Sequence, residues 1–110
     1  MTEQRIRFRD IKPYDCVDSL DELRGPGAGV VTLPVTVYWS GASSTFDLSK
    51  ERERASVYQA ALANGTRERI AEFVNRDLLI KDWPRLALDR RVVEMWEGKF
   101  PELAARGREF

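Results

Sequence analysis

The chain of 110 residues contains no histidine and one cysteine, Cys16. Without histidine, the commonest general base and metal ligand is missing, and with it the usual catalytic triads. A single cysteine allows neither an intrachain disulfide nor a thiolate cluster around a metal. Cys16 and the serines Ser40, Ser43 and Ser44 remain as nucleophiles, but no base that would activate them is recognisable. We therefore expect no enzyme activity, no metal and no cofactor.

Long apolar runs and a net charge are also missing. No stretch approaches the roughly 18 apolar residues that a membrane-spanning helix requires, and the first ten residues lack the apolar core of a secretory signal. The 18 basic and 18 acidic residues cancel, so no overall field draws the protein to nucleic acid or anionic lipid. We expect a cytoplasmic protein that binds no membrane.

The length fits a single domain, 1–110, with a strand-rich part (1–48) before a helical part (49–110). Alternation from Arg5 to Ile11 predicts a half-buried strand. A short helix is expected over 19–24, with Asp18 as its N-cap and a glycine-proline-glycine stop after it. The β-branched and aromatic run 30–39 predicts one strand or two short ones, since Pro34 belongs at an edge or a break. Residues 45–48 predict a short returning strand.

Four capped, amphipathic helices are expected between residues 47 and 101. Their N-caps are predicted at Asp47 or Ser49, then at Thr66, Asp77 and Asp89. The first is expected to end in a left-handed turn at Asn64-Gly65, and Pro84 limits the third. The fold class is therefore α+β, a short N-terminal antiparallel sheet with a C-terminal bundle of about four short helices.

Large apolar side chains at helical spacing predict the core of the helical part. The residues expected in one buried cluster are Val57, Phe73, Trp83, Val93 and Trp96. Two carboxylates of the third helix, Asp77 and Asp82, are interpreted as a cap and as part of a solvated face. Nothing in the sequence separates their pKa values into an acid and a base.

A protein partner is the function that the surface signals favour. The predicted N-terminal strand places Arg5, Arg7 and Arg9 on one face, and paired arginines bind carboxylates or phosphates through charge-assisted hydrogen bonds. Trp39 ends a run whose edge could pair with a partner strand, and tryptophan is enriched at interface hot spots. These four residues are the candidate partner-binding set.

A small DNA-binding regulator that uses the same arginine face is the alternative. The strand and helix at the N-terminus are similar to ribbon-helix-helix regulators, although a glycine-rich run stands where that fold needs its second helix. Residues 66–83 could form a helix-turn-helix. Its second helix would read DLLIKDW, however, which is apolar and acidic where a major groove requires polar and basic side chains.

Several short motifs follow one another between Trp39 and Leu103. They are Trp39-Ser40-Gly41, Phe46-Asp47-Leu48, Gly65-Thr66, Asp77-Leu78-Leu79 with Trp83-Pro84, and Val92 with Trp96. The pattern resembles a small actinobacterial protein family whose members often lie beside nucleotidyltransferase-type toxins of the abortive-infection class. The resemblance implies an antitoxin or accessory regulator that occludes a toxin encoded nearby. It covers a little over half of the chain.

Overall fold

The computed structural model describes residues 14–34, 37 and 45–106. Over these residues the predicted α+β fold class is confirmed, since a two-stranded antiparallel sheet precedes the helices. The predicted strand at residues 5–11, with Arg5, Arg7 and Arg9, lies outside the described residues, as does Trp39. Within the described ranges, no helix combines the length and the apolar character needed to cross a membrane.

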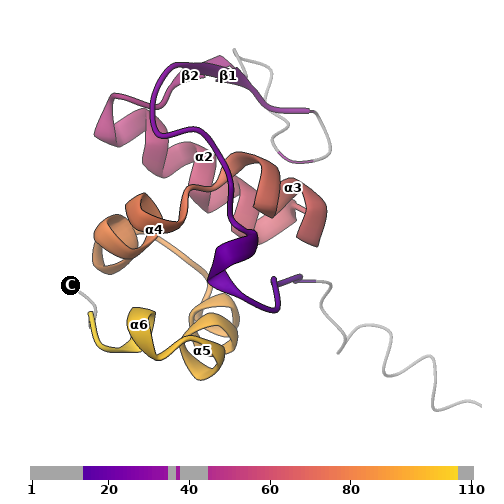
Figure 1. Cartoon of the computed structure of the whole chain (residues 1–110), viewed down its shortest axis with the longest axis vertical. Coiled ribbons are helices and arrows are strands. Elements are labelled where there is room, and N and C mark those ends of the chain that lie inside the picture. The colour runs from indigo at the N-terminus through magenta and orange to yellow at the C-terminus, as the bar shows by residue number, and fades with distance from the viewer. Residues whose placement is uncertain (1–13, 35–36, 38–44, 107–110) are drawn as a thin grey trace, which may run out of the picture.

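The elements form three tiers along the longest axis (Figure 1). Strands β1 (Val30–Thr32) and β2 (Thr45–Asp47) and helix α2 (Glu51–Asn64) lie at one end. Helices α3 (Arg67–Phe73) and α4 (Arg76–Asp82) follow, with the 3-10 turn η2 (Trp83–Arg85). Helices α5 (Arg90–Lys99) and α6 (Pro101–Ala104) close the other end. The N-terminal segment, with the 3-10 turn η1 (Leu20–Glu22), runs from the α5 end to the sheet.

The sheet pairs β1 and β2 in a register that places Val31 opposite Phe46. These two side chains are half-buried and pack against the core, whereas Val30 and Thr32 face outward. Of the run 30–39, predicted to form one strand or two short ones, the described residues form a strand at Val30–Thr32, and residues 35, 36, 38 and 39 lie outside the description. Pro34 explains the early end, because its carbonyl accepts a hydrogen bond from the Val37 amide (2.9 Å), the spacing of a β-turn.

Of the four caps predicted between residues 47 and 101, those at Thr66 and Asp89 are confirmed, whereas those at Asp77 and at Asp47 or Ser49 are wrong. The side chains of Thr66 and Asp89 accept backbone N–H groups at the starts of α3 and α5. Helix α4 is capped by Asn75, whose side chain accepts from the Leu78 amide at 3.1 Å. Asp77, the predicted cap, lies inside the first turn, where a carboxylate still suits the positive end of the helix dipole.

The boundaries of α2 also differ from prediction. Lys50 occupies the N-cap position and makes no side-chain cap, while Asp47 accepts from the amide and hydroxyl of Ser49 just before the helix. Gly65 ends the helix with φ −83°, so the predicted left-handed turn is wrong. Glycine is needed there for space, because a Cβ at Gly65 would lie 2.7 Å from the Ala61 carbonyl oxygen.

The N-terminal 3-10 turn is capped one residue later than predicted. Ser19, not Asp18, is the N-cap, and its side chain accepts from the Asp21 amide at 3.1 Å. The Glu22 carboxylate in return accepts from the amides of Ser19 (3.1 Å) and Asp18 (3.0 Å). This capping box satisfies amides that the short turn leaves open.

The core contains the tryptophans expected there. Trp83, Trp96 and Val57 are fully buried, and Phe73 is nearly so. Val93 is only half-buried against this core, because Val92 shares the inward stripe of α5 with Trp96, four residues on.

Candidate functional site

The outer edge of β1 has backbone N–H and C=O groups that form no hydrogen bond with the rest of the described residues. The Leu48 amide donates to the Gly29 carbonyl at 2.7 Å, which fixes the alternation of the antiparallel ladder. By that alternation Val31 bonds to Phe46, and Val30 and Thr32 direct their N–H and C=O groups outward. Within the described ranges, no partner contacts these outward groups.

The outer edge of β2 is closed at the matching position. The Asp47 amide donates to the Glu53 carboxylate at 2.8 Å, and the Asp47 carbonyl accepts from the Lys50 amide at 3.1 Å. A further strand can therefore add to β1 but not beside Asp47. The two edges of this small sheet are unequal, and β1 is the open one.

Exposed apolar surface lies on the same strand. Among the large hydrophobic side chains of the described residues, two are exposed: Val30 at 66% and Met95 at 37%. The Thr32 and Thr45 hydroxyls lie 3.1 Å apart across the outward face. β-Branched side chains on an open edge favour pairing with another strand.

A buried ion pair joins α2 to α4 and corrects the sequence interpretation of Asp82. Its carboxylate is buried and accepts from Arg54 through Nε (2.6 Å) and Nη2 (3.0 Å). Arg54 Nη1 also donates to the Leu48 carbonyl at 3.2 Å. The bond to Asp82 raises the pKa of the Arg54 guanidinium. With both carboxylate oxygens engaged, the pair positions elements and offers no acid or base for chemistry.

The same burial affects the helix-turn-helix interpretation. Helix α4, the would-be recognition helix, buries Leu79 and Asp82, so neither side chain can reach a DNA groove. Helix α3 packs against α2 and α4 packs against η2, while Arg76, Asp77 and Lys81 of α4 remain exposed.

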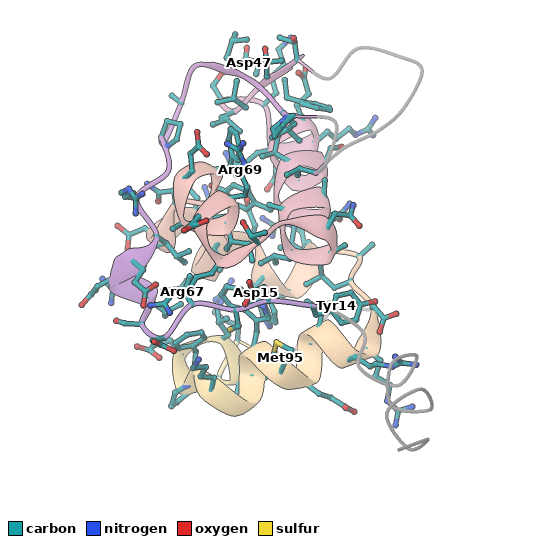
Figure 2. All side chains as sticks on the ribbon, turned by 90° about the vertical axis from the view of Figure 1, so that its right-hand side faces the viewer. Tyr14, Asp15, Asp47, Arg67, Arg69 and Met95 are labelled. Atoms are coloured by element: carbon teal, nitrogen blue, oxygen red, sulfur yellow. The ribbon has the colours of Figure 1, made fainter. Side chains whose placement is uncertain are left out.

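An open pocket of about 400 Å³ lies where the N-terminal segment passes the junction of α2 and α3. It is lined by Tyr14, Asp15, Asn64, Gly65 and Thr66. Figure 2 shows Tyr14 and Asp15 on the segment that crosses between α3 and α5. The pocket is therefore built from residues about fifty positions apart in the chain.

The polar groups of this pocket are fixed by hydrogen bonds. Asp15 accepts the Cys16 amide at Oδ1 (2.9 Å) and the Arg67 amide at Oδ2 (2.8 Å). Asn64 donates Nδ2 to the Val37 carbonyl at 2.9 Å. The neighbouring Cys16 thiol is half-buried, and burial raises its pKa to about 11.

An exposed ion-pair cluster connects the N-terminal segment to α3. Arg67 contacts Glu22 through Nε (2.8 Å) and Nη2 (2.9 Å), and also contacts Asp18 at 3.2 Å. Lys99 of α5 reaches the same Asp18 at 3.2 Å. The described part of the chain places no three histidine, cysteine or acidic residues where they could share a metal ion.

The sequence placed the partner-binding edge at residues 34–39, and most of these residues lie outside the described ranges. The open edge that the structure describes is β1, Val30–Thr32, which lies earlier in the same run and was not predicted as the edge for a partner. Glu53, which closes the other edge, carries no sequence signal beyond its place in the first turn of a helix. Tyr14 and Asp15 were not predicted, because nothing in their neighbourhood shows that they meet α2 and α3.

No protein-family model, no curated protein and no solved structure matches this chain. The resemblance of residues 39–103 to an actinobacterial family thus stays a prediction.

Proposed function

We propose that the chain is a non-enzymatic protein-interaction module that receives an extended segment of a partner protein on the outer edge of β1. The observation that carries the proposal is the open edge itself, where Val30 and Thr32 point backbone groups outward and Val30 is 66% exposed. Strand addition to such an edge supplies affinity through main-chain hydrogen bonds.

The inequality of the two edges supports a single incoming strand. Glu53 and Lys50 close β2 at Asp47, so growth of the sheet is one-sided. An arriving strand would meet the N–H and C=O groups of Val30 and Thr32 and cover the Val30 side chain. The pairing would also bury apolar surface now exposed to water.

The partner class comes from the resemblance. An antitoxin-like protein or accessory regulator would bind a toxin enzyme encoded nearby and occlude its active cleft. Trp39 lies in the chain between β1 and β2, and the arginines Arg5, Arg7 and Arg9 precede the described residues. These four residues remain proposed partner contacts beside the edge.

The test compares two substitutions of one edge residue. Thr32→Pro removes the outward N–H, whereas Thr32→Val keeps the N–H and loses only the hydroxyl contact with Thr45. The chain would be co-expressed with the product of the neighbouring gene, co-purified and weighed by native mass spectrometry. Thr32→Pro should weaken capture about tenfold, a loss of roughly 1.4 kcal/mol, and Thr32→Val should leave it nearly unchanged.

Equal capture by both variants would overturn the edge as the binding site. A homodimer that disappears with Thr32→Pro would also contradict the proposal, because the edge would then be occupied by a second copy of this chain.

A further inference from the structure

The pocket between the N-terminal segment and the α2–α3 junction has the size of a small-molecule site. Its volume of about 400 Å³ lies within the range of roughly 300–1,000 Å³ that ligand pockets occupy. It lies on a different part of the molecule from the β1 edge (Figure 2, where Asp47 of β2 lies at the top and Tyr14 well below it). Its chemistry is independent of the proposed function.

Hydrogen-bond acceptors dominate the lining. Two backbone amides hold the Asp15 carboxylate in place, one on each oxygen, and each oxygen keeps a further lone pair. Asn64 uses its amide nitrogen on the Val37 carbonyl, which leaves its Oδ1 as an acceptor. The Thr66 hydroxyl oxygen accepts the Arg69 amide at 3.3 Å.

The C-terminal end of α2 adds negative potential at the same place. The helix has 14 residues and ends at Asn64. The Gly65 amide bonds to the Ala61 carbonyl, and no described residue donates to the carbonyls of Leu62, Ala63 and Asn64. These carbonyls form the negative end of the helix dipole, which favours a cation.

An aromatic ring completes the lining. Tyr14 is half-buried, and its charged neighbours Asp89 and Arg91 have opposite signs. Two basic side chains of α3 near the lining are both paired: Arg67 with Glu22 and Asp18, and Arg69 with Glu72. An aromatic face beside a carboxylate is a common setting for an organic cation.

We propose that this pocket binds an alkylammonium or alkylguanidinium group. The cation's N–H groups would donate to Asp15 and to the Asn64 oxygen, and its alkyl stem would lie against Tyr14. The same group can come from a free amine or from a lysine or arginine side chain of a partner, and the pocket recognises what the two share.

The test follows the backbone amide signals of Gly65, Thr66 and Arg67 in the full chain by NMR. The probes are agmatine, for a free amine, and acetyl-arginine-amide, for a side chain. n-Butylurea is the neutral control of similar shape. We expect saturable shifts with at least one cationic probe and none with n-butylurea at the same concentration. Tighter binding of agmatine would identify a free amine as the source, and tighter binding of acetyl-arginine-amide would identify a side chain.

Two substitutions report on the lining. Asp15→Asn should weaken binding of the cationic probe about tenfold, because a charge-assisted hydrogen bond is lost. Because Asp15 also holds two amides, Tyr14→Leu provides a second measurement, with Tyr14→Phe as its control. Tyr14→Leu should weaken binding of the cationic probe, and Tyr14→Phe should not, because it keeps the aromatic ring. The proposal is overturned if n-butylurea shifts the same amides equally, if neither cation gives a saturable shift, or if Tyr14→Leu binds as tightly as Tyr14→Phe.

Discussion

Two arginine–carboxylate contacts hold distant parts of this chain together, and they differ in burial rather than in geometry. Arg54 binds Asp82 through two nitrogens at 2.6 and 3.0 Å, and Arg67 binds Glu22 in the same way at 2.8 and 2.9 Å. The first pair has side chains 8% and 3% exposed, and the second 48% and 27%.

Two ion pairs of the same geometry can therefore contribute very differently to the stability of the fold. Water already solvates the exposed pair in the unfolded chain and screens it in the folded one, so its net contribution is small. The buried pair has lost its water, and either partner alone would be left as an uncompensated charge in the core. The docking of the N-terminal segment must therefore depend more on packing than on its charges.

The largest effect is expected at Asp82. Replacement by alanine leaves the Arg54 guanidinium buried without its carboxylate, and should lower the free energy of unfolding by about 3–5 kcal/mol. Urea denaturation measures the loss. Asp77→Ala, on the exposed side of the same helix, is the control and should change stability by about 0.5 kcal/mol at most. A loss at Asp82 no larger than that of the control would show that water reaches the pair.

Gly25, a buried residue of the N-terminal segment, should give an intermediate effect. A Cβ there would lie 2.4 Å from the Phe73 carbonyl carbon and 2.6 Å from the Val74 nitrogen, both backbone atoms. Gly25→Ala should therefore destabilise the fold by about 1–3 kcal/mol, the range for overpacking. Gly27→Ala is the matched control, since the nearest atom to its Cβ would be Asn75 Nδ2 at 3.9 Å. Equal melting temperatures for the two variants would mean that the segment moves aside.

The smallest effect is expected from Arg67→Gln, and it should depend on pH. The Arg67 hydrogen bond lowers the pKa of Glu22, and the Lys99 hydrogen bond together with Arg67 lowers that of Asp18. A lowered folded-state pKa contributes stability above the ordinary value and loses it as the pH falls through the folded one. The difference in melting temperature between wild type and variant should thus be largest near pH 7 and vanish in strong acid.

A difference that persists in strong acid would contradict this account of the Arg67 cluster. High salt at neutral pH should reduce the difference in the same direction, because salt screens exposed charges.

Some local features of the fold were predicted from the sequence, and the long-range contacts were not. Thr66 and Asp89 cap their helices through bonds to residues two or three positions on, so a short stretch contains the whole cause. The Arg54–Asp82 pair spans 28 positions. Its signal was nevertheless present, because Arg54 lies three residues before buried Val57 and Asp82 three after buried Leu79. Opposite charges on the apolar stripes of two helices indicate a buried pair.

The pocket had no such signal. Tyr14 and Asp15 meet Asn64, Gly65 and Thr66 only because the N-terminal segment crosses the junction of two helices. Periodicity describes which face of an element is apolar, and it does not tell which distant segment will cover that face.

The single cysteine makes the crossing of this segment measurable. Cys16 packs against the core half-buried, with a thiol pKa raised to about 11 by burial. At neutral pH only about one thiol in 10⁴ is then ionised, so an alkylating reagent reacts mainly when the segment lifts away. The labelling rate, divided by that of a fully exposed thiol, gives the free energy of this local opening while the helices stay folded. The chain thus carries its own probe of how firmly its first described residues are held.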